Sequence, residues 1–351
     1  MNFFNYIEKG FLPFRRKFLS IALFCFISLL ISAQDIHFTQ IQASPLQINP
    51  ANTGMTYANV RLVNNYRNQW RTIEAPYNTI GVSLDKGFGI RNQNFGVGGL
   101  VLHDVSSPHQ LSVDKFYLSF GCSKFYKNHQ FSVGLQPGMV FKNINTASLT
   151  FNSQFDQNTG QFDPSLPSNE YNLQENVSFF DLNLGFLWRA RIKNLRPGAG
   201  ISVFHLTRPF EGFVSGIDSI RLAMRCNLHG SILIPLPANF DITPAILYSM
   251  VPGSNAFIGG GVLGFSLENP LLAIQRIYGL GLFRANPVRN FDAFMIGAGL
   301  QFKRLEIAVS YDMNLSSIRK VNNFYGAFEV SLIYRSIRLI SKDSAEPCYM
   351  L

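Results

Sequence analysis

The hydrophobic pattern is clearest near the end of the chain, between Phe291 and Arg335. There the apolar residues Phe294, Ile296 and Leu300 alternate with Met295 and with neighbours that are small or polar. A period of two residues predicts β-strands, because successive side chains of a strand point to opposite faces of the sheet. One apolar and one polar face fit two structures: a soluble antiparallel sheet with one wet face, or barrel strands whose apolar side contacts lipid.

The same alternation recurs along the chain, with turn residues between the segments. Fourteen segments are predicted to be strands: Tyr57–Trp70, Tyr77–Gly87, Phe95–Asp104, Leu111–Tyr126, Gln130–Asn143, Phe179–Ile192, Pro197–Leu206, Arg221–Pro235, Phe240–Met250, Asn255–Leu267, Gln275–Arg284, Phe291–Phe302, Leu305–Asn314 and Phe324–Arg335. An even strand number is typical of bacterial single-chain barrels. The last segment is expected to pair with the first and close the barrel.

The connections between these segments differ in length. Lys127 to His129 and Lys303-Arg304 are tight turns, whereas Thr146 to Ser178 is long, polar and rich in Asn, Gln, Ser and Pro. His205 to Ile220 is also extended. Short turns at one end and long loops at the other are typical of outer-membrane barrels.

The N-terminus predicts export. Residues 1–33 combine a basic start, the apolar run Phe18 to Ile31 and small residues before Gln34, as in a cleaved signal peptide. Residues 34–56 lack periodicity and are predicted to form an arm that either plugs the barrel or docks a periplasmic protein. Residues 57–336 form the predicted barrel, and residues 337–351 a C-terminal tail.

The composition favours barrel strands that contact lipid over a soluble sheet. Charged residues make up 15% of the chain, against roughly 25% in typical soluble domains, and 33 residues are Phe. A soluble β-sandwich would bury one face of each sheet, and it would have little use for a second face so rich in aromatic residues. The sequence therefore predicts an all-β fold, a transmembrane antiparallel β-barrel of about 14 strands, of the outer-membrane type.

Strand parity also assigns the residues that face the inside of this barrel. The predicted lumen is wet and carries both signs of charge, which makes these residues candidates for binding a partner. They are Arg61, Asn65, Arg67, Gln69, Asp85, Arg221, Arg225, Asp312 and Glu329. Arg67 is expected to pair with Asp85 or Asp312, and Trp70 to anchor the barrel at the membrane interface.

Few motifs in the sequence suggest a catalytic, cofactor or metal site. Residues 259–264 satisfy the letters GxGxxG, but they lie within a predicted strand, whereas a dinucleotide site needs them between a strand and a helix. The six histidines show no paired metal spacing, and the basic residues form no run of nucleic-acid type. We expect no catalytic residues, no cofactor and no nucleic-acid partner.

Several non-catalytic motifs resemble one known family. Ser44 to Gly54 (SPLQINPANTG), Asn65 to Trp70 (NYRNQW), Tyr77 to Asp85, Tyr311 to Asn314 and Gly326 to Leu332 are similar to the PorP/SprF family. Its members are outer-membrane proteins of the type IX secretion and gliding-motility machinery. The resemblance covers almost all of the chain after the predicted signal peptide.

The resemblance implies a non-catalytic barrel that helps to secrete partner proteins and to anchor them at the cell surface. Expected partners are other type IX components or a secreted protein with a C-terminal sorting domain, together with outer-membrane lipid. The polar lumen and residues 146–178 are the expected receptor for a partner segment. The alternative is an outer-membrane channel or a transporter of hydrophobic solutes.

Overall fold

The protein was analysed as a computed structural model. It describes residues 36–56, 59–71, 76–90, 93–106, 111–146, 149–170, 172–214, 221–267, 274–286, 290–316 and 325–336. The predicted signal peptide and the predicted C-terminal tail lie outside these residues. No helix in the described ranges is long and apolar enough to span a bilayer.

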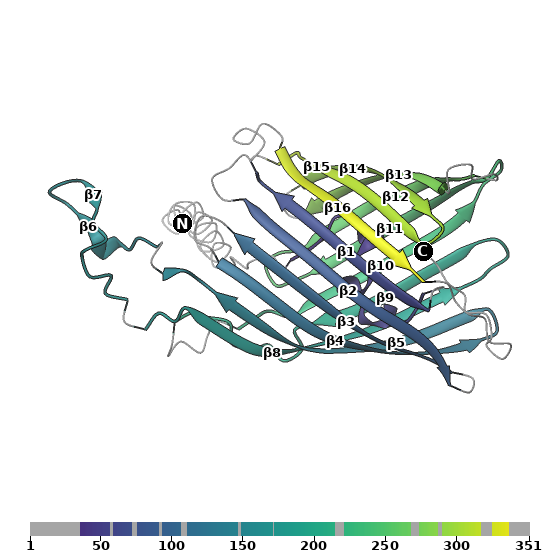
Figure 1. Ribbon diagram of the computed structural model, residues 1–351, viewed down its shortest axis with the longest axis horizontal. Helices are drawn as coiled ribbons and strands as arrows, with labels where there is room; N and C mark the ends of the chain where they lie inside the picture. The colour runs from purple at the N-terminus through teal and green to yellow at the C-terminus, as the bar shows by residue number, and fades with distance from the viewer. Residues whose placement is uncertain are drawn as a thin grey trace, which may run out of the picture.

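The described strands form a closed antiparallel barrel of fourteen strands (Figure 1). They are β1 (Val60–Gln69), β2 (Tyr77–Ile90), β3 (Gln93–Ser106), β4 (Leu111–Tyr126), β5 (His129–Asn143), β8 (Asn176–Ala190), β9 (Arg196–Phe204), β10 (Arg225–Pro235), β11 (Phe240–Met250), β12 (Ala256–Ser266), β13 (Ile274–Asn286), β14 (Asn290–Phe302), β15 (Leu305–Asn314) and β16 (Tyr325–Arg335). Each overlaps one predicted segment, so the predicted fold class is confirmed.

The two faces of the strands follow the alternation in the sequence. In β14, Ile296 is 53% exposed on the outside, whereas its neighbour Met295 is 0% exposed on the inside. Phe131, Val133 and Leu135 of β5 point outwards in the same way. This apolar outer surface is what a barrel presents to lipid.

The barrel closes where β1 pairs with β16, as predicted. The register places Arg67 opposite Glu329 and Tyr66 opposite Val330. Because every strand of the barrel has two hydrogen-bonded neighbours, the barrel sheet has no free edge, which a membrane requires.

The two ends of the barrel differ. At one end, here called the short-turn end, the strands join through tight turns such as 127–128 and 303–304. At the other, the long-loop end, residues 144–175 connect β5 to β8 and carry the small hairpin of β6 (Phe155–Asp156) and β7 (Gln161–Phe162). Figure 1 shows this hairpin projecting far beyond the barrel, at the left.

Residues 36–56, here called the arm, lie inside the barrel. They form three short helical turns, η1 (Ile41–Ala43), α2 (Pro45–Ile48) and η2 (Pro50–Asn52). Asn49 caps η2, since its side-chain oxygen accepts a hydrogen bond from the Ala51 N–H, and Pro50 occupies the first helical position. The absence of strand periodicity in this segment is explained by these turns.

One strand boundary differs from its prediction in a way that matters for the lumen. The segment Arg221–Pro235 was expected to be a strand throughout, but β10 begins at Arg225. Arg221 is exposed, and it forms an isolated bridge with Phe210 outside the barrel wall. The expectation that Arg221 faces the lumen is therefore wrong, because alternation cannot place a residue that lies beyond the strand.

Candidate functional site

The arm approaches the barrel wall so closely that glycines are required beneath it. A Cβ atom on Gly134 of β5 would lie 2.2 Å from the Pro50 carbonyl carbon, and one on Gly96 of β3 would lie 2.2 Å from the Thr53 oxygen. A side chain at either position would collide with backbone atoms. These glycines therefore let the arm lie directly against the inner surface of the barrel.

A buried charged cluster holds the arm at the long-loop end. Arg67 of β1 donates to Asp312 Oδ2 of β15 at 2.9 Å and to Glu329 Oε2 of β16 at 3.2 Å. The backbone N–H groups of Thr39 and Gln40 donate to the two Glu329 oxygens at 2.7 and 3.0 Å. The cluster thus joins three strands on the two sides of the closure to the first part of the arm.

Thr39 is the residue of the arm that enters this cluster most fully. Its hydroxyl donates to Asp312 Oδ2 at 2.8 Å and accepts a hydrogen bond from Arg67 Nη1. Arg67 is 2% exposed, Asp312 1% and Glu329 0%, so all three charges are out of water. Buried charges of this kind are tolerated only when they are paired and hydrogen-bonded, as these are.

A second ion pair holds the arm at the short-turn end. Arg61 and Asp85 lie opposite each other in the β1–β2 register and form a bidentate pair at 2.8 and 3.0 Å. The Arg61 guanidinium also donates to the Asn52 carbonyl at 3.1 Å, and Asp85 accepts from the Gly54 N–H at 2.8 Å. The arm therefore crosses the lumen from the long-loop end to the short-turn end before β1 begins.

Between these pairs, the middle of the arm bonds to the far wall. Asn49 is 0% exposed and donates to the carbonyls of Phe186 at 2.9 Å and Ile201 at 3.2 Å, on β8 and β9. The Ser202 hydroxyl donates to the Ile48 carbonyl at 2.6 Å. A side chain of the arm thus bonds to backbone carbonyls of the barrel, and a side chain of the barrel satisfies a backbone carbonyl of the arm.

The structure places the predicted lumen residues as follows. Arg61 pairs with Asp85, and Arg67 pairs with Asp312 and Glu329, so of the two partners expected for Arg67 the structure brings Asp312 to it. Asn65 donates to the Ala43 carbonyl at 2.8 Å. These six residues bind the arm or its anchors, so the inner surface that was expected to receive a partner is in part covered by the chain itself.

The remaining predicted residues lie nearer the long-loop end. Gln69 is half-buried and accepts from Arg67 Nη2 at 3.3 Å. Arg225 is 8% exposed, and its guanidinium carbon lies 4.3 Å from the centroid of the Phe204 ring. Arg221 lies outside the lumen, where its Nη1 donates to the Arg208 carbonyl at 3.3 Å.

Sequence reasoning missed the residues of the arm that make these contacts, above all Thr39 and Asn49. A signal for Asn49 was present in the SPLQINPANTG motif, but the strand pattern gave no way to find its partners. Among the described residues no three His, Cys, Asp or Glu side chains lie close enough together to hold a metal ion.

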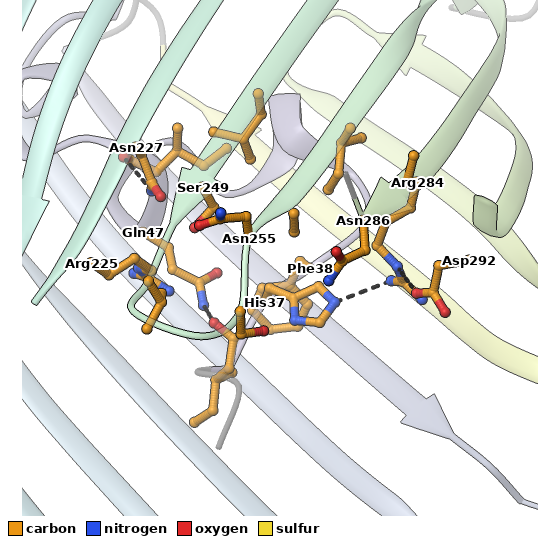
Figure 2. Close-up of a pocket in the computed structure, with 18 of the residues that line it drawn as sticks. His37, Phe38, Gln47, Arg225, Asn227, Ser249, Asn255, Arg284, Asn286 and Asp292 are labelled. Atoms are coloured by element: carbon orange, nitrogen blue, oxygen red, sulfur yellow. Dashed lines mark hydrogen bonds and ion pairs between the residues drawn. The ribbon is translucent and has the colours of Figure 1, made fainter. Parts of the chain in front are cut away.

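A cavity of about 540 Å³ remains at the long-loop end, beside the first residues of the arm (Figure 2). His37, Phe38, Gln47 and Ile48 of the arm form one wall, and residues of β10 to β14, with residues that follow β11 and β15, form the other. His37 lies 3.1 Å from Arg284 Nη1, and Arg284 Nε donates to Asp292 at 2.6 Å. The arm thus occupies part of the lumen and leaves this space near its mouth.

These features define an outer-membrane-type β-barrel whose lumen holds its own N-terminal arm. Residues 30–334 match the family "Type IX secretion system membrane protein PorP/SprF". The chain belongs to this family, as its motifs predicted. No curated protein matches the chain in sequence.

Solved barrels with a similar fold are distant in sequence. The monoaromatic hydrocarbon channel CymD is 8% identical, with a TM-score of 0.52 over 84% of this chain and 93% of CymD. The toluene transporter TbuX of Ralstonia pickettii is 10% identical, with a TM-score of 0.51 over 84% of this chain and 93% of TbuX. At these identities the likeness concerns the fold alone.

Proposed function

We propose that this chain is a non-catalytic outer-membrane barrel of the type IX secretion machinery that anchors partner proteins at the cell surface. Membership of the PorP/SprF family supports a place in type IX secretion. The occupied lumen supports a binding role over a conducting one, because the arm is bonded to β1, β2, β8, β9, β15 and β16.

The occupied lumen is the observation that carries this proposal. A fourteen-stranded barrel is wide enough to leave a passage unless side chains or a plug fill it. Residues 36–56 lie in the lumen and bond to the buried ion pairs near both of their ends, which supports their acting as a plug. Partners then bind at the long-loop end, where the hairpin of β6 and β7 projects beyond the wall (Figure 1).

Affinity purification of the tagged barrel from its own outer membrane tests the proposal. After chemical crosslinking and detergent extraction, we expect a secreted protein with a C-terminal sorting domain, or a further type IX component, to co-purify in near-stoichiometric amount. An unrelated tagged outer-membrane barrel extracted in parallel is the control. Recovery of the barrel without a specific partner would refute the anchoring role.

The second candidate function is transport of a hydrophobic solute, and the cavity favours it. Several of its lining residues are apolar, and two solved barrels of similar fold are described as a hydrocarbon channel and a toluene transporter. Uptake of radiolabelled toluene into cells with and without the gene separates the two functions. Gene-dependent uptake would favour the transporter.

A further inference from the structure

The cavity at the long-loop end has an apolar floor. Ile48 of the arm, Leu247 of β11 and Ile258 of β12 line it and belong to one buried hydrophobic cluster. Figure 2 shows polar side chains gathered around this space, among them Asn227, Ser249 and Asn255. The site therefore offers an apolar surface beneath a ring of amide and hydroxyl groups.

One amide of this ring has an unused acceptor. Asn227 of β10 is 4% exposed, and its Nδ2 donates to the Ile48 carbonyl at 3.4 Å. Its Oδ1 is buried and has no hydrogen-bond partner among the described residues, and the same holds for the hydroxyl oxygen of Ser316. Buried acceptors are almost always satisfied, so a ligand with an N–H or O–H donor fits this site.

Arg284, one of the arginines that line the cavity, is already paired and offers little free charge to an anionic ligand. Arg284 Nε lies 2.6 Å from Asp292 Oδ2, and its Nη1 lies 3.7 Å from Asp312 Oδ2. This guanidinium is therefore already neutralised by carboxylates of the barrel. A plain hydrocarbon is also a poor match, because it would cover the floor and leave the Asn227 oxygen without a donor.

We propose that this cavity binds an extended peptide segment of a partner protein, inserted from the long-loop end. A backbone N–H of the segment donates to Asn227 Oδ1, and an apolar side chain packs on Ile48, Leu247 and Ile258. A peptide supplies donors and apolar groups together, at alternating positions along an extended chain. This inference rests on the proposed anchoring function and names the site at which the partner is held.

Site-specific photocrosslinking in the living cell tests the assignment. Benzoylphenylalanine replaces Asn255, which lines the cavity, or, as the control, Leu263, which lies in β12 and is 51% exposed on the outer surface. After irradiation, crosslinked peptides are identified by mass spectrometry. We expect one segment of a secreted partner at Asn255, in at least tenfold excess over Leu263.

Two variants relate the crosslink to the cavity. Asn227→Leu removes the acceptor and keeps the side chain's size, and should lower the crosslink yield roughly two- to tenfold, the effect of one hydrogen bond. Ile258→Trp fills the floor and should abolish the crosslink, whereas Leu263→Trp in the same strand should not. Assembly of each variant is checked by its heat-modifiable migration in SDS gels.

The outcomes separate this inference from the proposed function. If a partner co-purifies with the barrel but its crosslinks map to residues 144–175 and spare Asn255, the cavity assignment fails and anchoring stands. If no partner co-purifies, anchoring itself fails. The melting temperature of the barrel is also measured with saturating toluene. If toluene raises the melting temperature of the wild type but not that of Ile258→Trp, the cavity is a hydrocarbon site and the peptide assignment is wrong.

Discussion

Replacing Arg67 by methionine tests how strongly the buried cluster at the long-loop end stabilises the barrel. The substitution keeps a long apolar side chain and removes the guanidinium that contacts Asp312 at 2.9 Å and Glu329 at 3.2 Å. Both carboxylates then stay buried, at 1% and 0% exposure, and lose their main compensating charge. We expect the free energy of unfolding to fall.

The size of the effect follows from the contacts. Removing one partner of a buried ion pair costs about 3–5 kcal/mol, because the remaining charge is left uncompensated. Arg284 Nη1 stays 3.7 Å from Asp312 and offsets part of this loss. We therefore expect a loss of about 3 kcal/mol for Arg67→Met, near the lower end of that range.

Guanidinium unfolding in detergent micelles measures this difference. The fluorescence of the two tryptophans reports the transition, since Trp70 follows β1 and Trp188 lies in β8. Arg304→Met, at an exposed turn residue, is the matched control and should change stability by no more than about 0.5 kcal/mol.

A triple variant gives the sharper comparison. Arg67→Met combined with Asp312→Asn and Glu329→Gln leaves no uncompensated charge at the site. Because an amide has one oxygen where the Glu329 carboxylate has two, only one of the Thr39 and Gln40 N–H groups keeps its acceptor. We expect it to recover at least half of the stability lost by Arg67→Met alone. A loss below about 1 kcal/mol for the single variant, or a triple variant less stable than the single one, would mean that Arg67 does not stabilise the barrel by compensating these carboxylates.

Three further predictions concern the arm and the projecting hairpin. Gly134→Leu places a side chain where Pro50 lies, so it should displace the arm and produce conductance in planar bilayers; a silent, correctly assembled variant would contradict this. His37→Cys, in a background without other cysteines, should react with a membrane-impermeant maleimide on intact cells, while Lys127→Cys at the short-turn end should not. Equal labelling of the two variants would contradict the direction in which the arm is inferred to cross the lumen. The pKa of Asp156 in the projecting hairpin is lowered because the Asn158 N–H and the Thr159 hydroxyl donate to its carboxylate. These bonds should therefore persist above the ordinary aspartate pKa and be lost as the pH falls through the lowered value. A carboxyl NMR titration measures this pKa, and an ordinary aspartate value would contradict the prediction.

The strands were predictable because lipid imposes one requirement on all of them. An outward side chain must be apolar at every second position, and this pattern survives even at Pro244, which lies within β11 opposite Gly261. The predicted limits of Leu111–Tyr126, Phe240–Met250 and Leu305–Asn314 match those of β4, β11 and β15. Local alternation is enough for such segments.

The interior was less predictable because its contacts depend on register and on distant residues. The alternation along each strand predicts that Arg67 and Asp85 face inwards. The register between strands, however, places Asp85 opposite Arg61 and Glu329 opposite Arg67. The arm has no periodicity, and its partners lie far along the chain, as when Asn49 bonds to the Ile201 carbonyl. The path of the arm therefore depends on the shape of the lumen, and no strand-like periodicity in the sequence predicts it.

The conductance of the intact barrel shows whether the arm closes the lumen. The purified wild-type protein is inserted into a planar lipid bilayer, with Gly134→Leu as the variant in which the arm should be displaced. Because the arm lies in the lumen and is bonded to the wall at both ends, we expect no steady open-pore current for the wild type. A steady ohmic conductance of the assembled wild-type barrel would contradict it.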